Sequence, residues 1–354
     1  GQTILIPGFK AISHSIQEGE SLFLLAEKLS VPPDAVRLLN QNGHNVRLQP
    51  GHRLTLPVRT DYLMDESRRP YDFFQMTEMI NHLTAIYPFI RKTIAGHSVL
   101  GQPLVEISLG AGTRKVHMNA SFHANEWITT SVLMTFFADY LNALVNGTSL
   151  NGIPALNLYM ESTLSIIPMV NPDGVNLVLN GPPETEKSQL IGLNGGSTDF
   201  SGWKANIRGV DLNKQFPANW DFETKRLSKM PGPRDFPGFS PLTEPETEAM
   251  ARLACTEKFD RLLALHTQGN EIYWGYQGLE PAESHTLARE FQKESGYEAV
   301  RYVDSFVGFK DWFIQEFRKP GFTLELGKGK NPLPFSQFDQ IYGEAIGILV
   351  RALY

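Results

Sequence analysis

Short apolar stretches alternate with helical patterns over most of this chain, and that alternation limits the folds open to it. The stretches that read as strands are 103–110, 114–122, 162–170, 261–267, 299–303 and 321–327. Helical periodicity occurs at about 73–86, 127–146, 244–258, 282–295, 309–318 and 337–353. Because the strands are apolar almost throughout, both of their faces should be covered. The pattern predicts an α/β fold with helices on both faces of a sheet.

Polar residues follow several of these strands. His123 and Glu126 come after 114–122, the turn NPDG follows 162–170, His266 ends a strand, and Glu325 lies in the last strand. Active sites on open α/β sheets lie beyond the carboxyl ends of the strands. Charged residues are rarely buried without a partner, so core packing does not account for this grouping. We expect a functional site here.

The residue types point to zinc. His123 is the one histidine of nine with a glutamate three residues later, a pair that by itself has even odds of being accidental. A zinc hydrolase takes three His or carboxylate ligands and leaves a fourth position for water. We predict that His123, Glu126 and His266 bind one Zn²⁺. Glu325 is the candidate base that takes a proton from the water and passes it to the leaving amine.

The bulk properties exclude some partners. The 354 residues carry a net charge of −6 without a run of Lys or Arg, which argues against nucleic-acid binding. No stretch of 18 apolar residues occurs, so no membrane span is expected, and no signal peptide is recognisable. The single cysteine, Cys255, cannot form an intrachain disulfide and is expected to be a small core residue.

Residues from about 70 to 354 resemble the zinc carboxypeptidase family. The motifs that carry the resemblance occur in the family's order: HANEW at 123–127, NPDG at 171–174, GVDLN at 209–213, LALHT at 263–267 and FTLELG at 322–327. The resemblance implies a mixed, twisted sheet with helices on both faces. It also implies the zinc ligands and the catalytic glutamate named above.

Two positions depart from the pattern of family members that remove single C-terminal residues. Asn125 stands between the ligands where those proteins usually carry arginine, and Lys214 follows Asn213 where they carry a second arginine. Lysine is a point charge rather than a planar fork, so recognition of a terminal carboxylate should be weaker. We expect Asn125, Asn213 and Lys214 to contact a different substrate.

Two cations are candidates for the group that stabilises the oxyanion. Lys204 aligns with the family's arginine in the stretch WKANIRGVDLN, whereas Arg208 keeps a guanidinium and ranks slightly first on chemical grounds. Tyr302 is the candidate for a tyrosine that hydrogen-bonds substrate, because it precedes the dipeptide DW at 311–312 by a few residues.

Residues 11–57 form a separate small module in this interpretation. Their pattern predicts the order strand, helix, helix, strand, and Ser21 can cap the first helix. The stretches EGESL, LLN and PGHRLTLP resemble a LysM module, which implies an α+β unit that binds polymers containing N-acetylglucosamine. Residues 1–7 resemble the end of a preceding copy, because GQTILIP repeats the pattern of GHRLTLP at 51–57. Residues 58–72 read as a linker, and 73–354 as the peptidase domain.

Together these features resemble the bacterial γ-D-glutamyl-L-diamino acid endopeptidases. The resemblance implies cleavage of peptidoglycan stem peptides between γ-D-Glu and diaminopimelate or lysine, with the LysM module holding the wall. It implies a location at the cell wall or spore, with the cytoplasm or forespore as alternatives. Two alternative functions remain: a zinc carboxypeptidase that acts on ordinary peptides, and a glycan-binding protein without catalytic activity.

Overall fold

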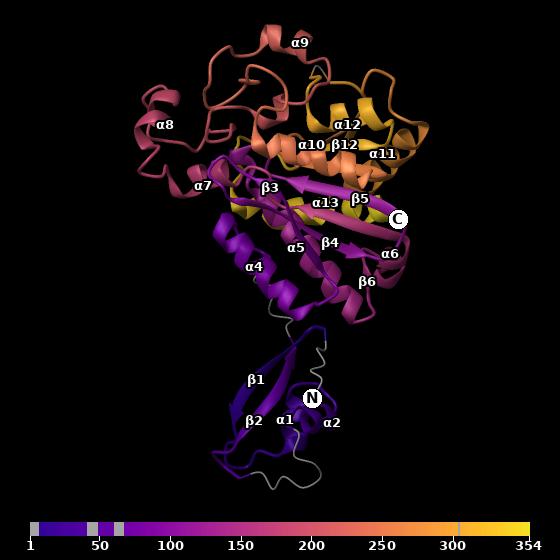
Figure 1. Cartoon of the computed structure of the whole chain (residues 1–354). Coiled ribbons are helices and arrows are strands. Elements are labelled where there is room, and N and C mark those ends of the chain that lie inside the picture. Colours follow the sequence, from indigo (N-terminus) through magenta and orange to yellow (C-terminus); the bar gives the residue numbers. More distant parts are fainter. Residues whose placement is uncertain (1–6, 41–48, 60–66, 304) are drawn as a thin grey trace.

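A mixed sheet forms the centre of the computed structural model, which describes residues 7–40, 49–59, 67–303 and 305–354 (Figure 1). Its strands are β3 (Arg91–His97), β4 (Pro103–Gly110), β5 (Arg114–Ala120), β8 (Ser162–Ile167), β9 (Arg261–His266), β10 (Glu271–Tyr273), β11 (Glu298–Val300) and β12 (Gly321–Glu325). The order across the sheet is β11-β10-β12-β9-β5-β8-β4-β3. The central strands β12, β9, β5 and β8 run parallel, while β10, β4 and β3 introduce antiparallel pairs. The predicted mixed α/β sheet is confirmed.

Both faces of the sheet are covered, which explains why the central strands are apolar along their whole length. In β9, Leu263 and Leu265 belong to one buried cluster, and Leu262 and Ala264 belong to another. Because side chains alternate between the two faces of a strand, these clusters lie on opposite sides of the sheet.

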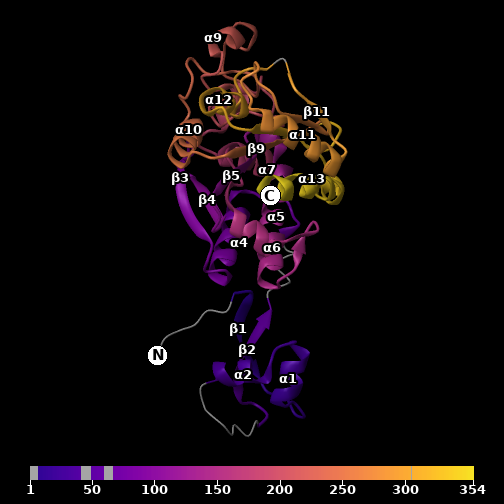
Figure 2. The same ribbon diagram turned by 90° about the vertical axis from the view of Figure 1, so that its right-hand side faces the viewer.

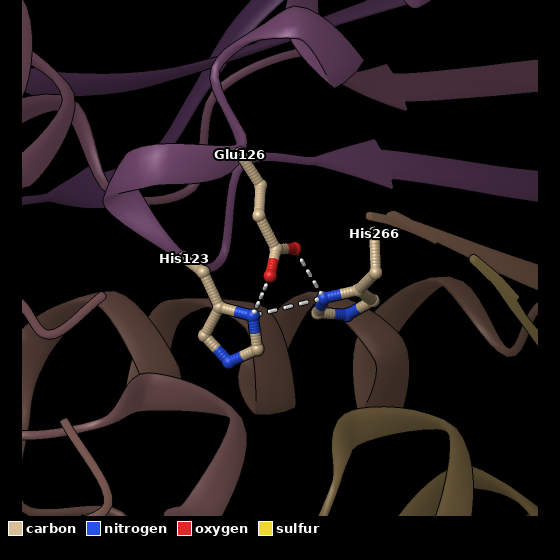
Figure 3. Close-up of side chains that lie close together, drawn as sticks. All are labelled: His123, Glu126 and His266. Carbon is tan, nitrogen blue, oxygen red and sulfur yellow. Dashed lines mark hydrogen bonds and ion pairs between the residues drawn. The ribbon is translucent and has the colours of Figure 1, made fainter. Parts of the chain in front are cut away.

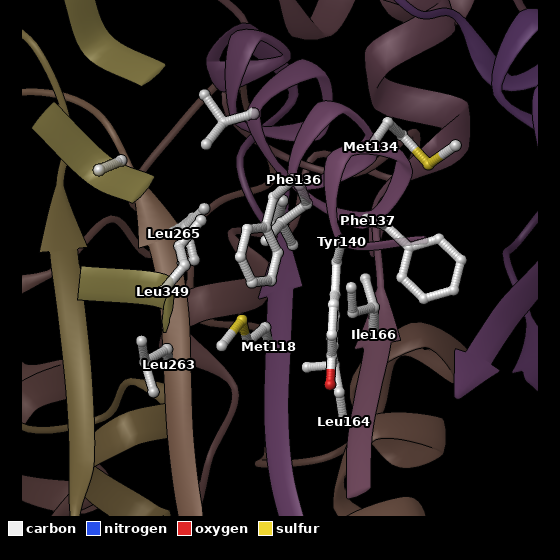
Figure 4. Close-up of a cluster of buried hydrophobic side chains, with 14 of the residues drawn as sticks. Met118, Met134, Phe136, Phe137, Tyr140, Leu164, Ile166, Leu263, Leu265 and Leu349 are labelled. Atoms are coloured by element: carbon white, nitrogen blue, oxygen red, sulfur yellow. The ribbon is translucent and has the colours of Figure 1, made fainter. Parts of the chain in front are cut away.

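Different helices supply each side. The first side is covered by α4 (Phe73–Ile86), α5 (Ile128–Val145), α6 (Ala155–Glu161), α11 (Ala282–Ser295) and α13 (Phe338–Leu353). The second is covered by α10 (Pro245–Glu257) and α12 (Phe309–Phe317). Figure 4 shows Phe136 and Tyr140 of α5 and Leu349 of α13 against the strands. Helix α5 is apolar and long enough to cross a membrane, but 78% of it is buried inside the protein, where it serves as a core helix.

The predicted helices agree with those observed to within a few residues, and the differences have local causes. Strand β3 gave no apolar signal because it is an exposed edge strand. The irregular region 181–242 follows α7 (Pro172–Asn180) and contains the short helices α8 (Lys187–Leu193) and α9 (Trp220–Glu223) and two 3-10 helices, Leu212–Lys214 and Thr224–Arg226. Cys255 is exposed rather than part of the core, because it lies on the outer face of α10. His117 is buried in β5 against Phe259.

The amino-terminal residues form a small unit with its own core (Figure 2). Its elements are β1 (Phe9–Ser15), α1 (Leu22–Lys28), α2 (Pro33–Leu39) and β2 (Arg53–Arg59), with β1 and β2 antiparallel. The Ser21 side chain accepts a hydrogen bond from Leu24 N at 3.2 Å and caps α1. Asn40 joins α2 to β2 because its side chain accepts from Thr55 N and donates to Thr55 O. The expected remnant of a preceding copy lies, apart from Pro7, outside the described residues, as do residues 60–66 of the expected linker.

Candidate metal centre and active site

The carboxyl ends of three parallel strands meet at one point of the sheet. His266 is the last residue of β9 and Glu325 is the last residue of β12, and these two residues are register partners. Strand β5 lies on the other side of β9, with Ala120 opposite Leu265. After β5 the chain turns through Ser121, whose positive φ of 52° redirects the backbone. The turn delivers His123 to the same edge as His266 and Glu325.

His123, Glu126 and His266 converge at the centre of this edge (Figure 3). Glu126 lies in the short 3-10 helix Ala124–Glu126, three residues after His123. His123 Nδ1 lies 2.9 Å from Glu126 Oε1, and His266 Nδ1 lies 3.0 Å from Glu126 Oε2. The two Nδ1 atoms are 3.1 Å apart. All three side chains are buried.

Asp211 fixes the orientation of the first ligand from behind. Its Oδ1 lies 3.2 Å from His123 Nε2, on the side of the ring away from Glu126. A ring that donates from Nε2 to a carboxylate leaves the lone pair of Nδ1 free for a metal. Burial alone would lower the pKa of His123, but Glu126 and Asp211 outweigh it and raise that pKa. Burial opposes the charge of Asp211, yet His123, Lys204 and Lys214 hold the Asp211 pKa well below its usual range.

The three side chains fit a zinc ion. Two imidazole nitrogens and a carboxylate are the ligand set of a hydrolytic zinc site, and their ligand atoms lie within 4.8 Å of one another. His266 Nε2 is buried and has no partner within the described part of the chain, whereas Nδ1 is the ring nitrogen that faces His123 and Glu126. The second ring nitrogen of His123 is already held by Asp211. The residues can therefore bind one metal through three protein ligands.

A cavity of about 450 Å³ opens onto this triad. Glu325 lines it together with His123, Glu126 and Lys204. Burial and the nearby charge of Glu126 raise the pKa of Glu325 to about 8 in the metal-free protein. A carboxyl with a raised pKa beside the metal triad suits a group that accepts and returns a proton near neutral pH.

Lys204 is a second candidate catalytic group in this cavity. The backbone of Lys204 is held on both sides, since Lys204 N donates to Pro233 O at 2.8 Å and Ala124 N donates to Lys204 O at 3.0 Å. Burial alone would lower the pKa of Lys204, but the carboxylates of Asp211, Glu126 and Glu325 outweigh it and raise that pKa. The ammonium group therefore stays charged next to the place where a substrate carbonyl would lie.

Two residues expected in the site lie elsewhere. Arg208, which ranked first for the oxyanion, does not line the cavity; its Nη1 lies 3.5 Å from Glu244 Oε2 and its side chain is 53% exposed. The backbone turn at Asn206, whose Oδ1 accepts from Arg208 N, directs that side chain outward. Tyr302 is 52% exposed and lines a different cavity of about 400 Å³.

Of the three residues expected to contact the substrate, one lines the cavity and two lie outside its lining. Asn125 lines the metal cavity, and its buried Oδ1 has no partner among the described residues. Asn213 and Lys214 lie outside the lining: Asn213 Oδ1 accepts from Phe309 N at 3.1 Å. Lys214 Nζ lies 3.2 Å from Glu223 Oε1 and 3.0 Å from Ser305 Oγ. The positive charge of Lys214 is thus paired with the buried carboxylate of Glu223.

Sequence reasoning missed several residues that border the metal triad or the cavity, among them one acid, two cations and a tyrosine. Asp211 stands within the quoted motif GVDLN, so that motif could have indicated a partner for a ligand histidine. Arg234, Tyr273 and Lys330 line the cavity. Tyr273 lies on β10, a strand of three residues with too short a pattern to recognise. Arg234 and Lys330 lie in loops, where no periodicity marks a residue's direction.

A profile of the zinc carboxypeptidase family matches residues 76–346, and the chain belongs to that family. It is therefore a zinc metallopeptidase, and the cluster of His123, Glu126 and His266 is where the ion can bind.

Proteins of known name and structure extend this result. The chain is 50% identical to γ-D-glutamyl-L-diamino acid endopeptidase 1 of Lysinibacillus sphaericus, over 100% of this chain and 90% of that protein. It is 51% identical to an uncharacterized protein of Bacillus subtilis (strain 168), over 82% of this chain and 78% of that protein. Bovine thrombin-activatable fibrinolysis inhibitor shares the fold with a TM-score of 0.65 at 19% identity, over 81% of this chain and 97% of that one.

The contact between Asp211 and His123 leads to a testable prediction. In Asp211→Asn the side chain keeps its shape but loses the negative charge that makes the ring a better donor to the metal. We expect zinc to bind about ten- to a hundredfold more weakly, measured by competition with a chromophoric chelator. Asp199→Asn is the matched control, because Asp199 is exposed and does not line the cavity. Equal affinities of the two variants would contradict the role given to Asp211.

Proposed function

We propose that this chain hydrolyses the bond between γ-D-Glu and the L-diamino acid of peptidoglycan stem peptides. The observation that carries the proposal is the 50% identity over the whole chain to an endopeptidase named for that bond. The state of Lys214 supports it, since a cation paired with Glu223 is poorly placed to bind a free terminal carboxylate. Removal of single residues from ordinary peptides is the weaker alternative for that reason. A role in the cell wall or spore follows from the proposed substrate.

The geometry suggests how the residues divide the work. His123, Glu126 and His266 would hold a zinc ion, which would supply an acidified water molecule and a polarised scissile carbonyl. Glu325 would accept a proton from the attacking water and return it to the leaving amine. Lys204 offers its ammonium group to the oxygen that becomes negative in the transition state. Asn125 lines the cavity, and its side-chain amide can form a hydrogen bond with a substrate amide; its buried Oδ1 has no partner among the described residues.

We also propose that the amino-terminal unit, residues 11–57, is a LysM module that binds the glycan. The described part has the order strand, helix, helix, strand and its own buried core. This unit would keep the peptidase near its substrate and raise the local concentration of stem peptides.

The reaction can be tested with defined muropeptides and mass spectrometry of the products. We expect the wild type to release a fragment ending in γ-D-Glu and a fragment beginning with the diamino acid. A chelator should stop the reaction and added zinc should restore it. Glu325→Gln should lose at least about a hundredfold in kcat while keeping bound zinc, because it cannot exchange a proton. Release of ordinary C-terminal L-amino acids instead would favour a carboxypeptidase, and full activity of Glu325→Gln would contradict the assigned base.

The choice between Lys204 and Arg208 leads to a separate prediction. Lys204→Gln should lower kcat by about a hundred- to a thousandfold because the oxyanion loses its cation, whereas Arg208→Gln should stay within about twofold of the wild type. Lys204→Arg should recover part of the rate, and circular dichroism with zinc content shows whether each variant folds. A large loss in Arg208→Gln with a small loss in Lys204→Gln would reverse the assignment.

Glycan binding is tested with the full chain carrying Glu325→Gln, so that the substrate survives. We expect co-sedimentation with insoluble peptidoglycan whose stem peptides have been removed, and competition by soluble N-acetylglucosamine oligomers. If removal of the stem peptides abolishes binding, the active site alone holds the wall and the LysM proposal fails.

A further inference from the structure

The cavity at the metal triad carries more positive charge than catalysis requires. Three cations line it, Lys204, Arg234 and Lys330, against the two carboxylates Glu126 and Glu325. Glu126 is committed to the two histidines. Arg234 and Lys330 have no part in the reaction described above. We propose that Arg234 and Lys330 are specificity residues that bind free carboxylates of the substrate on either side of the scissile bond.

Arg234 is carried by a loop whose position is fixed against the catalytic residues. Lys204 N and Ala205 N both donate to Pro233 O, at 2.8 and 3.0 Å. Asp235 N donates to Asp211 Oδ2 at 3.4 Å, which ties the loop to the partner of His123. The backbone on each side of Arg234 is therefore attached to a residue of the metal site.

The guanidinium of Arg234 is available for a ligand. Its Nε lies 3.2 Å from Asp235 Oδ2, a contact between two side chains that are 59% and 47% exposed. Among the residues that the structure describes, its terminal nitrogens have no acceptor. An exposed pair with a neighbouring residue stabilises little. Two guanidinium nitrogens that face a cavity suit the two oxygens of a carboxylate.

Lys330 lies on a second anchored loop, directly after β12. Gly329 N donates to Gln268 Oε1 at 3.2 Å, and the Asn331 side chain exchanges hydrogen bonds with Thr267, which follows the ligand His266. The exposed Lys330 side chain forms no ion pair within the described ranges, although its charge, after the hydrogen bonds from Ser201, helps to lower the pKa of Asp199. The loop thus presents an ammonium without a direct ion-pair partner among the described residues to the cavity.

The proposed substrate offers anions that match these two cations, and the inference rests on the proposed function for that reason. A glutamate linked through its γ-carboxyl keeps its α-carboxylate free, close to the scissile bond. Diaminopimelate carries a further carboxylate at the far end of its side chain, on the other side of that bond. Arginine forms a bidentate pair with a carboxylate, and lysine binds one as a point charge. The two sources of carboxylate can be separated chemically.

The test combines charge removal in the enzyme with charge removal in the substrate. Arg234→Gln and Lys330→Gln are compared with Lys328→Gln, which lies on the same loop as Lys330, is exposed and does not line the cavity. Three muropeptides are used: one with both carboxylates free, one with the D-Glu α-carboxyl amidated, and one with the distal diaminopimelate carboxyl amidated.

We expect each cavity variant to lose about tenfold in kcat/KM on the fully charged muropeptide, chiefly through KM, as removal of a charge-assisted hydrogen bond predicts. The loss should disappear for the substrate whose matching carboxylate is amidated, which assigns each cation to one source. Lys328→Gln should behave like the wild type on all three substrates.

The result that overturns the inference is equal behaviour of Arg234→Gln, Lys330→Gln and Lys328→Gln, or a loss that is the same for charged and amidated substrates. Wild-type turnover alone decides the proposed function. The same comparison made by equilibrium binding in the Glu325→Gln background needs no turnover, so it decides the inference even when no substrate is cleaved.

Discussion

The parallel pairing of β9 with β5 and with β12 is the constraint on which the site depends. It places His266 opposite Glu325 in register and brings the end of β5 to the same edge. Since β-strand register shifts in whole residues and a shift of one turns every side chain to the other face, the metal ligand and the base cannot be moved independently. The core clusters on both faces hold that register. The packing that stabilises the sheet therefore also sets the geometry of the active site.

Electrostatic interactions between neighbouring side chains determine which buried groups of the site are charged at the same time. Glu126 and Asp211 are buried carboxylates, and each is compensated by His123 from one side of its ring. Lys204 adds a positive charge that both of them stabilise. Glu325 has no hydrogen-bond or ion-pair partner among the described residues, and burial and the charge of Glu126 raise its pKa to about 8. A carboxylate that stays charged can serve as the metal ligand. A carboxylate that is protonated and deprotonated near neutral pH can carry the proton.

The sequence predicted the parts of the site that local pattern determines. Strand ends, and the three-residue spacing of His123 and Glu126, were visible because they follow apolar runs. The choice between Arg208 and Lys204 was not visible, because it depends on a turn held by Asn206 and by the distant Glu244. Tyr302 was placed by its distance from a motif, although the tyrosine that lines the cavity is Tyr273 on the short strand β10. Side-chain direction in loops depends on contacts far away in the sequence, so these residues needed the fold.

The placement of cations separates an enzyme that cuts within a chain from one that trims its end. Lys214 stands where the family resemblance places a carboxylate anchor, but it is paired with Glu223, which is buried and also contacts Arg226. Freeing Lys214 for a ligand would leave part of a buried carboxylate without its cation, which is costly. The terminal carboxylate of a substrate would therefore gain little binding free energy from Lys214. Arg234 and Lys330, by contrast, line the metal cavity; Arg234 is paired only with the exposed Asp235, and Lys330 forms no ion pair among the described residues. Positive charge is thus available beside the scissile bond rather than at the position that reads a chain end, as internal cleavage of an anionic peptide requires.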